Sequence, residues 1–137
     1  MKVIIAAAAA TLALAAPAFA EGDAAAGEKE FKKCKSCHMI VSPEGEEIVK
    51  GGKTGPNLYG VIGRTAGATD FKYAPGLKEA NEAGFVWTEE AVAAYVQDPK
   101  AWLSDNGFAN KSKMTFKLKK GAEDVAAYLA SVAPAAE

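Results

Sequence analysis

The sequence has few of the side chains that most often carry chemistry. Its 137 residues include one histidine, two cysteines and one arginine. Zinc sites need about four nitrogen or sulfur ligands, so Cys34, Cys37 and His38 are too few for one. A formal net charge of −1 at pH 7 argues against general nucleic-acid binding. After residue 20, no hydrophobic run is long enough to cross a bilayer and no alternating strand pattern is evident. These absences predict a small, soluble, all-α protein.

The N-terminus has the pattern of an export signal. Lys2 precedes the apolar stretch 3–16, and the small-x-small triplet Ala18-Phe19-Ala20 follows. This pattern predicts a secretory signal peptide over 1–20 that is cleaved after Ala20. The alternative is an uncleaved anchor, but the stretch is shorter than the roughly 20 residues that span a membrane. The mature chain, 21–137, has the length of one domain, and we expect it in the periplasm.

Three segments have helical patterns, and long loops separate them. Asp23 is a candidate N-cap for a helix over 24–33, a second helix begins at Thr88 and ends at Asp98-Pro99, and a third runs from about 122 to 132. Segments 42–76 and 103–120 are predicted to be irregular. Loops this long are uncommon in a compact domain unless they serve a function. A large buried cofactor would give them a surface to pack on.

The stretch CKSCH, residues 34–38, contains both cysteines and the only histidine. Cys34 and Cys37 lie three apart and His38 follows at once, so all three share one helical turn. This is the pattern of c-type haem attachment. Two thiols add to the vinyl groups of one haem, and the imidazole reaches its iron.

Other uses of the two cysteines are weaker. A Cys34–Cys37 disulfide suits an oxidising compartment, but it closes a very short loop and gives little entropic stabilisation. A thioredoxin-like dithiol needs a βαβ context, and no such strands are predicted. Haem attachment is therefore the favoured interpretation, with a disulfide or dithiol as the alternative.

Few residues could serve as the second axial ligand of the haem iron. Beyond Met1, the only methionines are Met39 and Met114. Met39 adjoins His38 and cannot reach the opposite side of the iron, which leaves Met114. Its alternative role is to fill a gap in the core, but its neighbours are polar and rich in lysine. His/Met ligation is typical of electron-transfer cytochromes, and with both axial positions filled we expect an electron carrier and no enzyme activity.

The order of motifs resembles the class I c-type cytochromes, and the bacterial cytochrome c2 type most of all. The resemblance covers nearly all of the mature chain and rests on CKSCH, KTGPNLYGVIGR, FKY, Trp87, YVQDP, KMTF and AYL in this order. It implies a class I cytochrome c fold, with crossing terminal helices and long loops wrapped around one covalent haem c. Gly27, Phe31, Tyr128 and Leu129 match the helix crossing. The segment from Pro99 to Met114 is longer than in mitochondrial relatives, with an insertion around 104–110.

The resemblance also implies roles around the haem. The carbonyl of Pro56 would accept a hydrogen bond from the iron-bound histidine. Arg64, Tyr73 and Trp87 match groups near the propionates, although Tyr73 and Trp87 are equally explained as core aromatics. Tyr95 matches a tyrosine close to the methionine sulfur, and Ser112 stands where the family has a threonine near the inner propionate.

Lysines are concentrated in two short windows, 29–35 and 111–120, which together contain one acidic residue, Glu30. If the fold brings the windows together, one face is strongly positive and would steer an anionic partner. The predicted docking residues are Lys32, Lys33, Lys35, Lys111, Lys113, Lys117 and Lys119. The resemblance implies a monomer that carries electrons from a quinol–cytochrome c oxidoreductase to a photosynthetic reaction centre or a cytochrome c oxidase. The alternative is a haem c protein with a displaceable methionine that acts on peroxide or small ligands.

Overall fold

The computed structural model describes residues 22–134, so the predicted signal peptide over 1–20 lies outside the described residues. In chain order the elements are α1 (Ala24–Glu30), the short 3₁₀ helix η1 (Phe31–Lys33), β1 (Ile40–Val41), β2 (Glu47–Val49), α2 (Pro75–Glu82), α3 (Glu89–Gln97), α4 (Pro99–Asp105) and α5 (Ala122–Ser131). Within 22–134, no helix combines the length and hydrophobicity that a membrane span requires. The mostly helical fold that the sequence predicts is confirmed.

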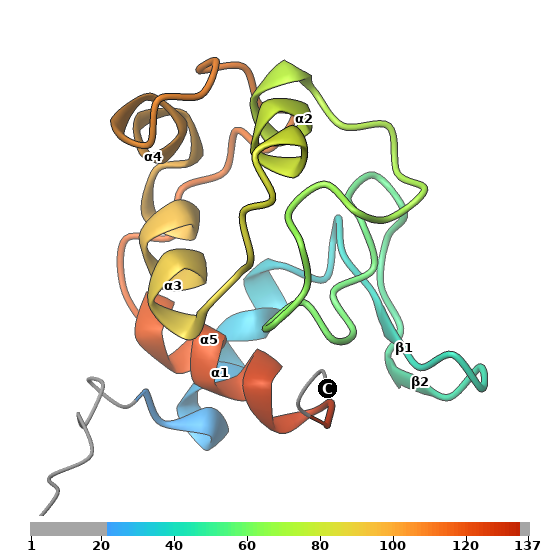
Figure 1. Cartoon of the computed structure of the whole chain (residues 1–137). Coiled ribbons are helices and arrows are strands. Elements are labelled where there is room, and N and C mark those ends of the chain that lie inside the picture. The colour runs from blue at the N-terminus through green and yellow to red at the C-terminus, as the bar shows by residue number, and fades with distance from the viewer. Residues whose placement is uncertain (1–21, 135–137) are drawn as a thin grey trace, which may run out of the picture.

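The first and last helices cross each other, as the family resemblance implies (Figure 1). The Asp23 carboxylate caps α1 by accepting hydrogen bonds from the Ala25 and Ala26 N–H groups. At the crossing, a Cβ placed on Gly27 would lie 1.9 Å from the Asp124 carbonyl oxygen. The rings of Phe31 and Tyr128 pack beside it with centroids 5.7 Å apart. Gly27 therefore lets the two backbones approach.

Helices α3 and α4 meet at Asp98-Pro99. The Thr88 hydroxyl caps α3 by accepting the Ala91 N–H at 3.0 Å, as predicted. The Asp98 carboxylate then accepts the Ala101 N–H at 3.1 Å and begins α4. The prediction of loop from residue 103 onward was therefore wrong for 103–105. Proline blocks helical geometry in the residue before it, yet it is well suited to the first turn of a helix, so Asp98-Pro99 both ends one helix and begins another.

Helix α2 was not predicted, and its first two residues, Pro75 and Gly76, fall in the segment 42–76 that was predicted to be irregular. Pro75 occupies its first turn, and its buried positions are Gly76 and Ala80. These small residues give the sequence no apolar stripe of the usual size. The helix is defined by tertiary packing instead, since Gly76 packs against Leu103 and against the chain after α4.

A two-stranded antiparallel ribbon, β1 with β2, contradicts the expectation of no strands. Ile40 pairs with Val49 and Val41 with Glu47, with a bulge between them. The Asn57 side chain supports the ribbon, since it bonds both the N–H and the carbonyl of Val41. Strands of two and three residues are too short to show an alternating pattern.

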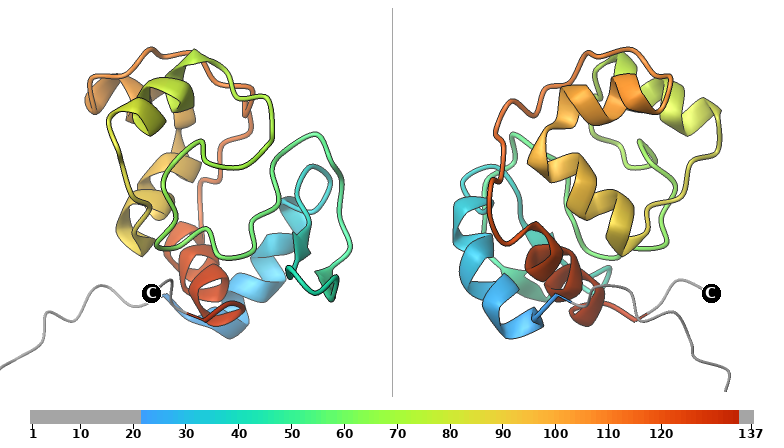
Figure 2. Two further views of the ribbon diagram at one scale, coloured as in Figure 1. Left: turned by 45° about the vertical axis from the view of Figure 1, so that its right-hand side comes forward. Right: turned by 90° about the vertical axis from the view of Figure 1, so that its left-hand side faces the viewer.

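The loop between β2 and α2 curls around one side of the molecule, and helices α3 to α5 occupy the other (Figures 1 and 2). Backbone hydrogen bonds fix this loop to the segment before α3. The Gly63 N–H donates to the Trp87 carbonyl at 2.7 Å, and the Trp87 N–H donates to the Arg64 carbonyl at 2.9 Å. These bonds hold the loop in a defined position beside the start of α3.

Candidate functional site

A cavity of about 490 Å³ lies between the loops and the helices. Its apolar wall comes from elements throughout the chain and includes Phe31, Leu58, Val61, Leu77, Val92, Val96, Val125 and Leu129. Every residue that was predicted to bind or surround a haem lines it as well, namely Cys34, Cys37, His38, Pro56, Arg64, Tyr73, Trp87, Tyr95, Ser112 and Met114. The fold thus brings together residues that lie up to 80 positions apart in the sequence.

One wall is the helical turn of the CKSCH motif, which follows η1. The Cys37 and His38 N–H groups both donate to the Cys34 carbonyl, at 3.1 and 3.0 Å. Both thiols are free. Burial raises the pKa of the Cys34 thiol to about 11, and the neighbouring Glu30 and Cys37 add to the rise. Redox-active dithiols need a lowered thiol pKa, so this environment argues against the dithiol alternative.

The imidazole of His38 is held in one orientation. Its Nδ1 lies 2.8 Å from the Pro56 carbonyl oxygen, which can only accept, so Nδ1 donates and Nε2 is left as an acceptor. Only 9 % of the residue is exposed, and burial lowers its pKa, with a smaller opposite effect from the Pro56 bond. Gly55 leaves room for the ring, because a Cβ there would lie 2.5 Å from the His38 Cε1. His38 is therefore a neutral imidazole held in one orientation, with Nε2 left as an acceptor.

Ser112 links Met114 to helix α3. Its hydroxyl oxygen accepts the Met114 N–H at 3.0 Å and shares a hydrogen bond with the Tyr95 hydroxyl at 3.1 Å. Burial raises the pKa of Tyr95, partly offset by this bond, so the phenol stays protonated. The family resemblance implied separate roles for Tyr95 and Ser112 and did not predict their direct hydrogen bond. No spacing signal joins residues that lie 17 apart on different elements.

One polar atom of the Arg64 side chain has no hydrogen-bond partner in 22–134. Its Nη1 donates to the Asn57 and Tyr59 carbonyls at 3.1 and 3.2 Å. In the part of the chain that the structure describes, its Nε is the one buried side-chain nitrogen or oxygen without a hydrogen-bond partner. Burial also lowers the pKa of this guanidinium. Buried donors are normally paired, so the site provides a place for an additional acceptor, as a haem propionate would supply.

The remaining predicted residues have partners of their own. Tyr73 is bonded to the Thr69 hydroxyl at 2.5 Å and packs edge-on against Phe71. Trp87 lines the cavity and is also a core residue, with its ring centroid 5.1 Å from those of Tyr95 and Trp102. Trp87 is therefore a core aromatic that also lines the cavity, and its role beside a propionate stays a prediction.

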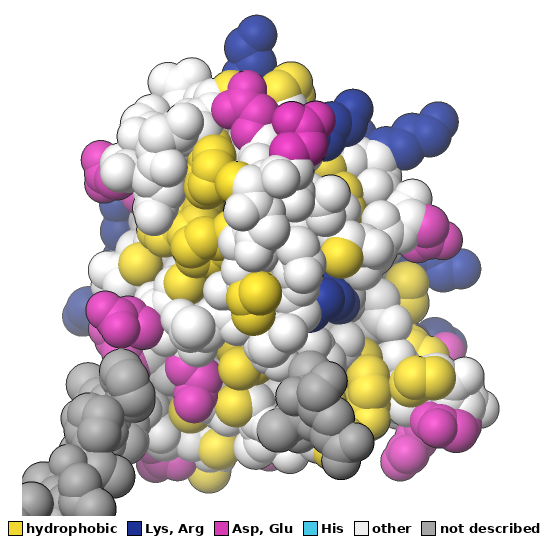
Figure 3. Space-filling model, in the orientation of Figure 1, with side chains coloured by type: hydrophobic (Ala, Val, Ile, Leu, Met, Phe, Trp, Pro, Cys, Tyr) yellow, Lys and Arg dark blue, Asp and Glu magenta, His cyan; other side chains and the backbone are white. Residues whose placement is uncertain are grey.

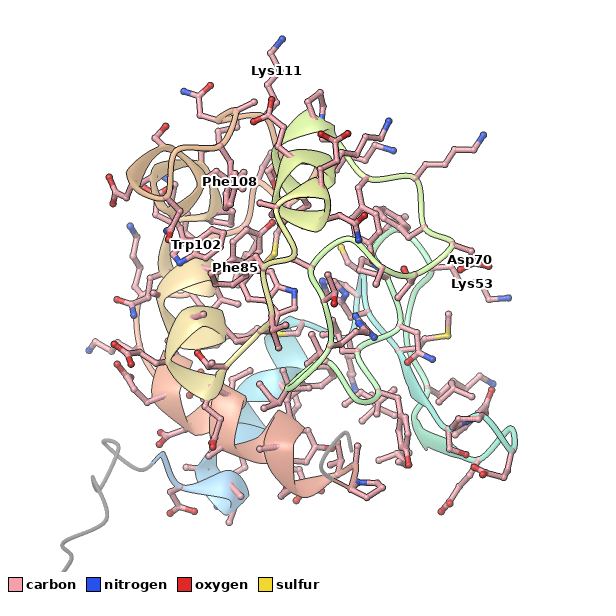
Figure 4. The ribbon with its side chains drawn as sticks, in the orientation of Figure 1. Lys53, Asp70, Phe85, Trp102, Phe108 and Lys111 are labelled. Atoms are coloured by element: carbon pink, nitrogen blue, oxygen red, sulfur yellow. The ribbon has the colours of Figure 1, made fainter. Side chains whose placement is uncertain are left out.

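An aromatic cluster behind Trp87 was not anticipated from the sequence. Phe85, Trp102 and Phe108 lie together at the junction of α2, α3 and α4 (Figure 4), and the Phe85 and Trp102 ring centroids are 5.1 Å apart. An apolar strip reaches the surface in this region (Figure 3). Phe108 belongs to the insertion around 104–110 and is partly buried, so part of the insertion packs against the core.

The two lysine windows meet at the cavity. Lys33 from the first window and Lys111 and Lys113 from the second all line it. Lys33 pairs with Glu30 at 2.9 Å, and Lys117 pairs with Asp98 at 3.2 Å. Elsewhere in the windows, the lysines without an ion pair to any described residue are Lys29, Lys32, Lys35, Lys111, Lys113, Lys119 and Lys120.

The attachment turn, the oriented histidine, the methionine and the crossed terminal helices together define a class I c-type cytochrome. No protein-family model matches the chain. It is 61 % identical to cytochrome c2 of Rhodobacter capsulatus over 96 % of this chain and 98 % of that protein. It is 54 % identical to cytochrome c-550 of Paracoccus versutus over 98 % of this chain and 91 % of that protein.

Solved structures agree with the sequence relatives. The crystal structure of the Rhodobacter capsulatus cytochrome c2 superposes with a TM-score of 0.78 at 60 % identity, covering 81 % of this chain and 98 % of that one. The chain belongs to the cytochrome c2 and c-550 family. It is an electron carrier and not an enzyme.

Proposed function

We propose that the chain binds one haem c covalently, with thioether bonds from the Sγ atoms of Cys34 and Cys37. In this proposal His38 Nε2 and Met114 Sδ are the axial iron ligands. The observation that carries it is that one largely apolar cavity collects both thiols, the thioether of Met114 and an imidazole whose Nδ1 is already committed to Pro56. This donor set fits His/Met-ligated haem.

The polar residues of the cavity suit the haem carboxylates. The unpartnered Nε of Arg64 would donate to a propionate, which would gain a permanent cation beside it. Tyr73 and Trp87 line the same cavity and supply further donors. Ser112 would act mainly by shaping the turn that presents Met114, since its oxygen is already used by Tyr95 and by the Met114 N–H.

Bound haem would supply a one-electron redox couple at its iron. The residues of the chain would supply the ligands, their orientation and the apolar surroundings. His38 and Met114 would fill both axial positions and leave no site for a substrate. The Pro56 carbonyl keeps the imidazole oriented and strengthens it as a ligand. The apolar wall excludes water and lowers the local dielectric, which affects the reduction potential.

For partners we propose a quinol–cytochrome c oxidoreductase as donor, with a photosynthetic reaction centre or a cytochrome c oxidase as acceptor. The mature chain, 21–137, would act in the periplasm as a monomer after removal of residues 1–20. Docking would be transient and electrostatic, through the rim lysines Lys32, Lys33, Lys35, Lys111, Lys113, Lys117 and Lys119. The support is that both lysine windows reach the cavity that would hold the haem.

An absorption spectrum with a redox titration tests the haem assignment. The exported protein is expected to show reduced haem c bands and, when oxidised, a methionine-to-iron charge-transfer band, with a titration that fits one electron. Haem bands without the charge-transfer band would contradict Met114 as a ligand. Absence of all haem bands would contradict haem attachment and support the alternative that Cys34 and Cys37 form a disulfide or dithiol.

Electron transfer to an acidic partner is expected to slow as salt rises. Between about 10 and 150 mM ionic strength the Debye length falls from roughly 30 to 8 Å, so we expect the second-order rate constant to fall at least about tenfold. Stopped-flow mixing with the oxidoreductase or the oxidase measures it. Lys111→Gln should lower the rate at low salt, whereas Lys50→Gln, which does not line the cavity, should not. A rate independent of salt would contradict the docking proposal.

A further inference from the structure

The chain that leads to Met114 has no regular structure of its own. Between the end of α4 at Asp105 and the start of α5 at Ala122 there is neither helix nor strand. Its position must therefore come from contacts with the rest of the molecule. Residues 109, 111 and 113 each form a hydrogen bond with the same short part of the chain, residues 72–79.

The first contact is made by Glu79 on α2. Its carboxylate accepts the Ala109 N–H at 2.7 Å, across 30 residues of sequence. A carboxylate bonded to a backbone N–H is a charge-assisted bond, stronger than one between neutral groups. It ties the last part of the insertion to α2.

The second contact is a close approach of two backbones. The Gly76 N–H donates to the Lys111 carbonyl at 3.1 Å. A Cβ on Gly76 would lie 2.4 Å from the Ala109 carbonyl oxygen and 2.8 Å from that of Lys111. Any larger residue would push the segment away from α2.

The third contact involves Lys113, the residue before Met114. Its ammonium group donates to the Lys72 carbonyl, 41 residues away in sequence. It also lies over the Phe71 ring, 5.2 Å from the centroid, in a cation–π arrangement. Phe71 packs in turn against Tyr73, which lines the cavity.

We infer that Gly76, Glu79 and Lys113 form a clamp that holds residues 109–113 against α2 and the loop before it, and that they are positioning residues for Met114. The inference rests on the proposed role of Met114 as an iron ligand. From the other side, Ser112 is held by Tyr95 of α3. The segment is thus fixed between α2 and α3, and releasing the α2 side frees Met114 to leave the cavity.

The test is a titration of the haem-loaded mature protein with imidazole, which displaces Met114. Loss of the methionine-to-iron charge-transfer band measures the imidazole affinity. Glu79→Gln and Lys113→Leu are each expected to tighten imidazole binding by about fivefold. The first replaces a charge-assisted hydrogen bond by a weaker neutral one, and the second removes a charged donor, so each weakens the closed segment. The double variant should bind it more tightly than either. Lys113→Arg, which keeps a cationic donor over the Phe71 ring, should restore binding close to that of the unchanged protein.

Two matched variants control for loss of charge. Glu82 lies on the same helix and makes no side-chain hydrogen bond or ion pair with any residue in 22–134. Lys50 is exposed, does not line the cavity and makes no ion pair with any residue in 22–134. Glu82→Gln and Lys50→Leu are expected to leave the imidazole affinity unchanged.

Amide hydrogen exchange separates a clamp from a general loss of stability. Exchange should quicken at Ala109 in Glu79→Gln, while the amides of α1 and α5 exchange as before. An intact charge-transfer band with unchanged imidazole affinity in both clamp variants would overturn this inference alone. Absence of the band from the unchanged protein would overturn the ligand role of Met114, and the inference with it.

Discussion

Met114→Ala is expected to abolish the methionine-to-iron charge-transfer band and to open the iron to carbon monoxide and imidazole. The thioether favours ferrous iron, so its loss should also lower the reduction potential, by on the order of 0.1 V within the roughly 0.8 V range that axial ligands control. Both effects follow because Met114 is the one methionine among the cavity-lining residues. Spectra of the oxidised and reduced variant, with a redox titration, measure them.

Met39→Ala provides the matched control. Met39 adjoins His38 but does not line the cavity, so its removal should leave the band and the potential nearly unchanged. If Met114→Ala kept the charge-transfer band, or if Met39→Ala removed it, the ligand assignment would be wrong. Covalent attachment should survive both changes, because neither touches Cys34 or Cys37.

Gly27→Ala is expected to destabilise the folded protein by about 2 kcal/mol or more, as measured by denaturant unfolding of the haem-loaded chain. Two effects oppose each other. Alanine in place of glycine favours a helix by about 0.5–1 kcal/mol. The added methyl would, however, lie 1.9 Å from the Asp124 carbonyl oxygen and 2.8 Å from the Tyr128 Cβ. Overpacking of this kind costs about 1–3 kcal/mol and occasionally more, so the clash outweighs the gain in propensity.

Glu28→Ala tests whether the effect belongs to the crossing. Glu28 is the next residue of α1 and is exposed, so its replacement should change the free energy of unfolding by no more than about 0.5 kcal/mol. Equal stability of Gly27→Ala and the unchanged protein would show that α1 and α5 can separate at little cost. That result would contradict the role assigned to Gly27.

Residues close together in sequence were enough to predict most of the helices. The caps at Asp23 and Thr88 and the break at Asp98-Pro99 act within one helical turn, and the structure has these features as predicted. Helix α2 and the β1–β2 ribbon were not predicted, because neither has a recognisable hydrophobic pattern in the sequence. The small buried faces of α2 and the two or three residues of each strand are stable only against their neighbours.

By itself the sequence determined which reactive groups are available to the site. With one histidine, two cysteines spaced for one helical turn and one distant methionine, few assignments of the site chemistry were available. The tertiary structure decided how these groups are held. Pro56 meets His38, Ser112 joins Tyr95 to the Met114 backbone, and α2 grips residues 109–113 only because the chain folds back on itself. Hydrogen bonds between groups 17 to 41 residues apart depend on distances in space, which no local pattern records.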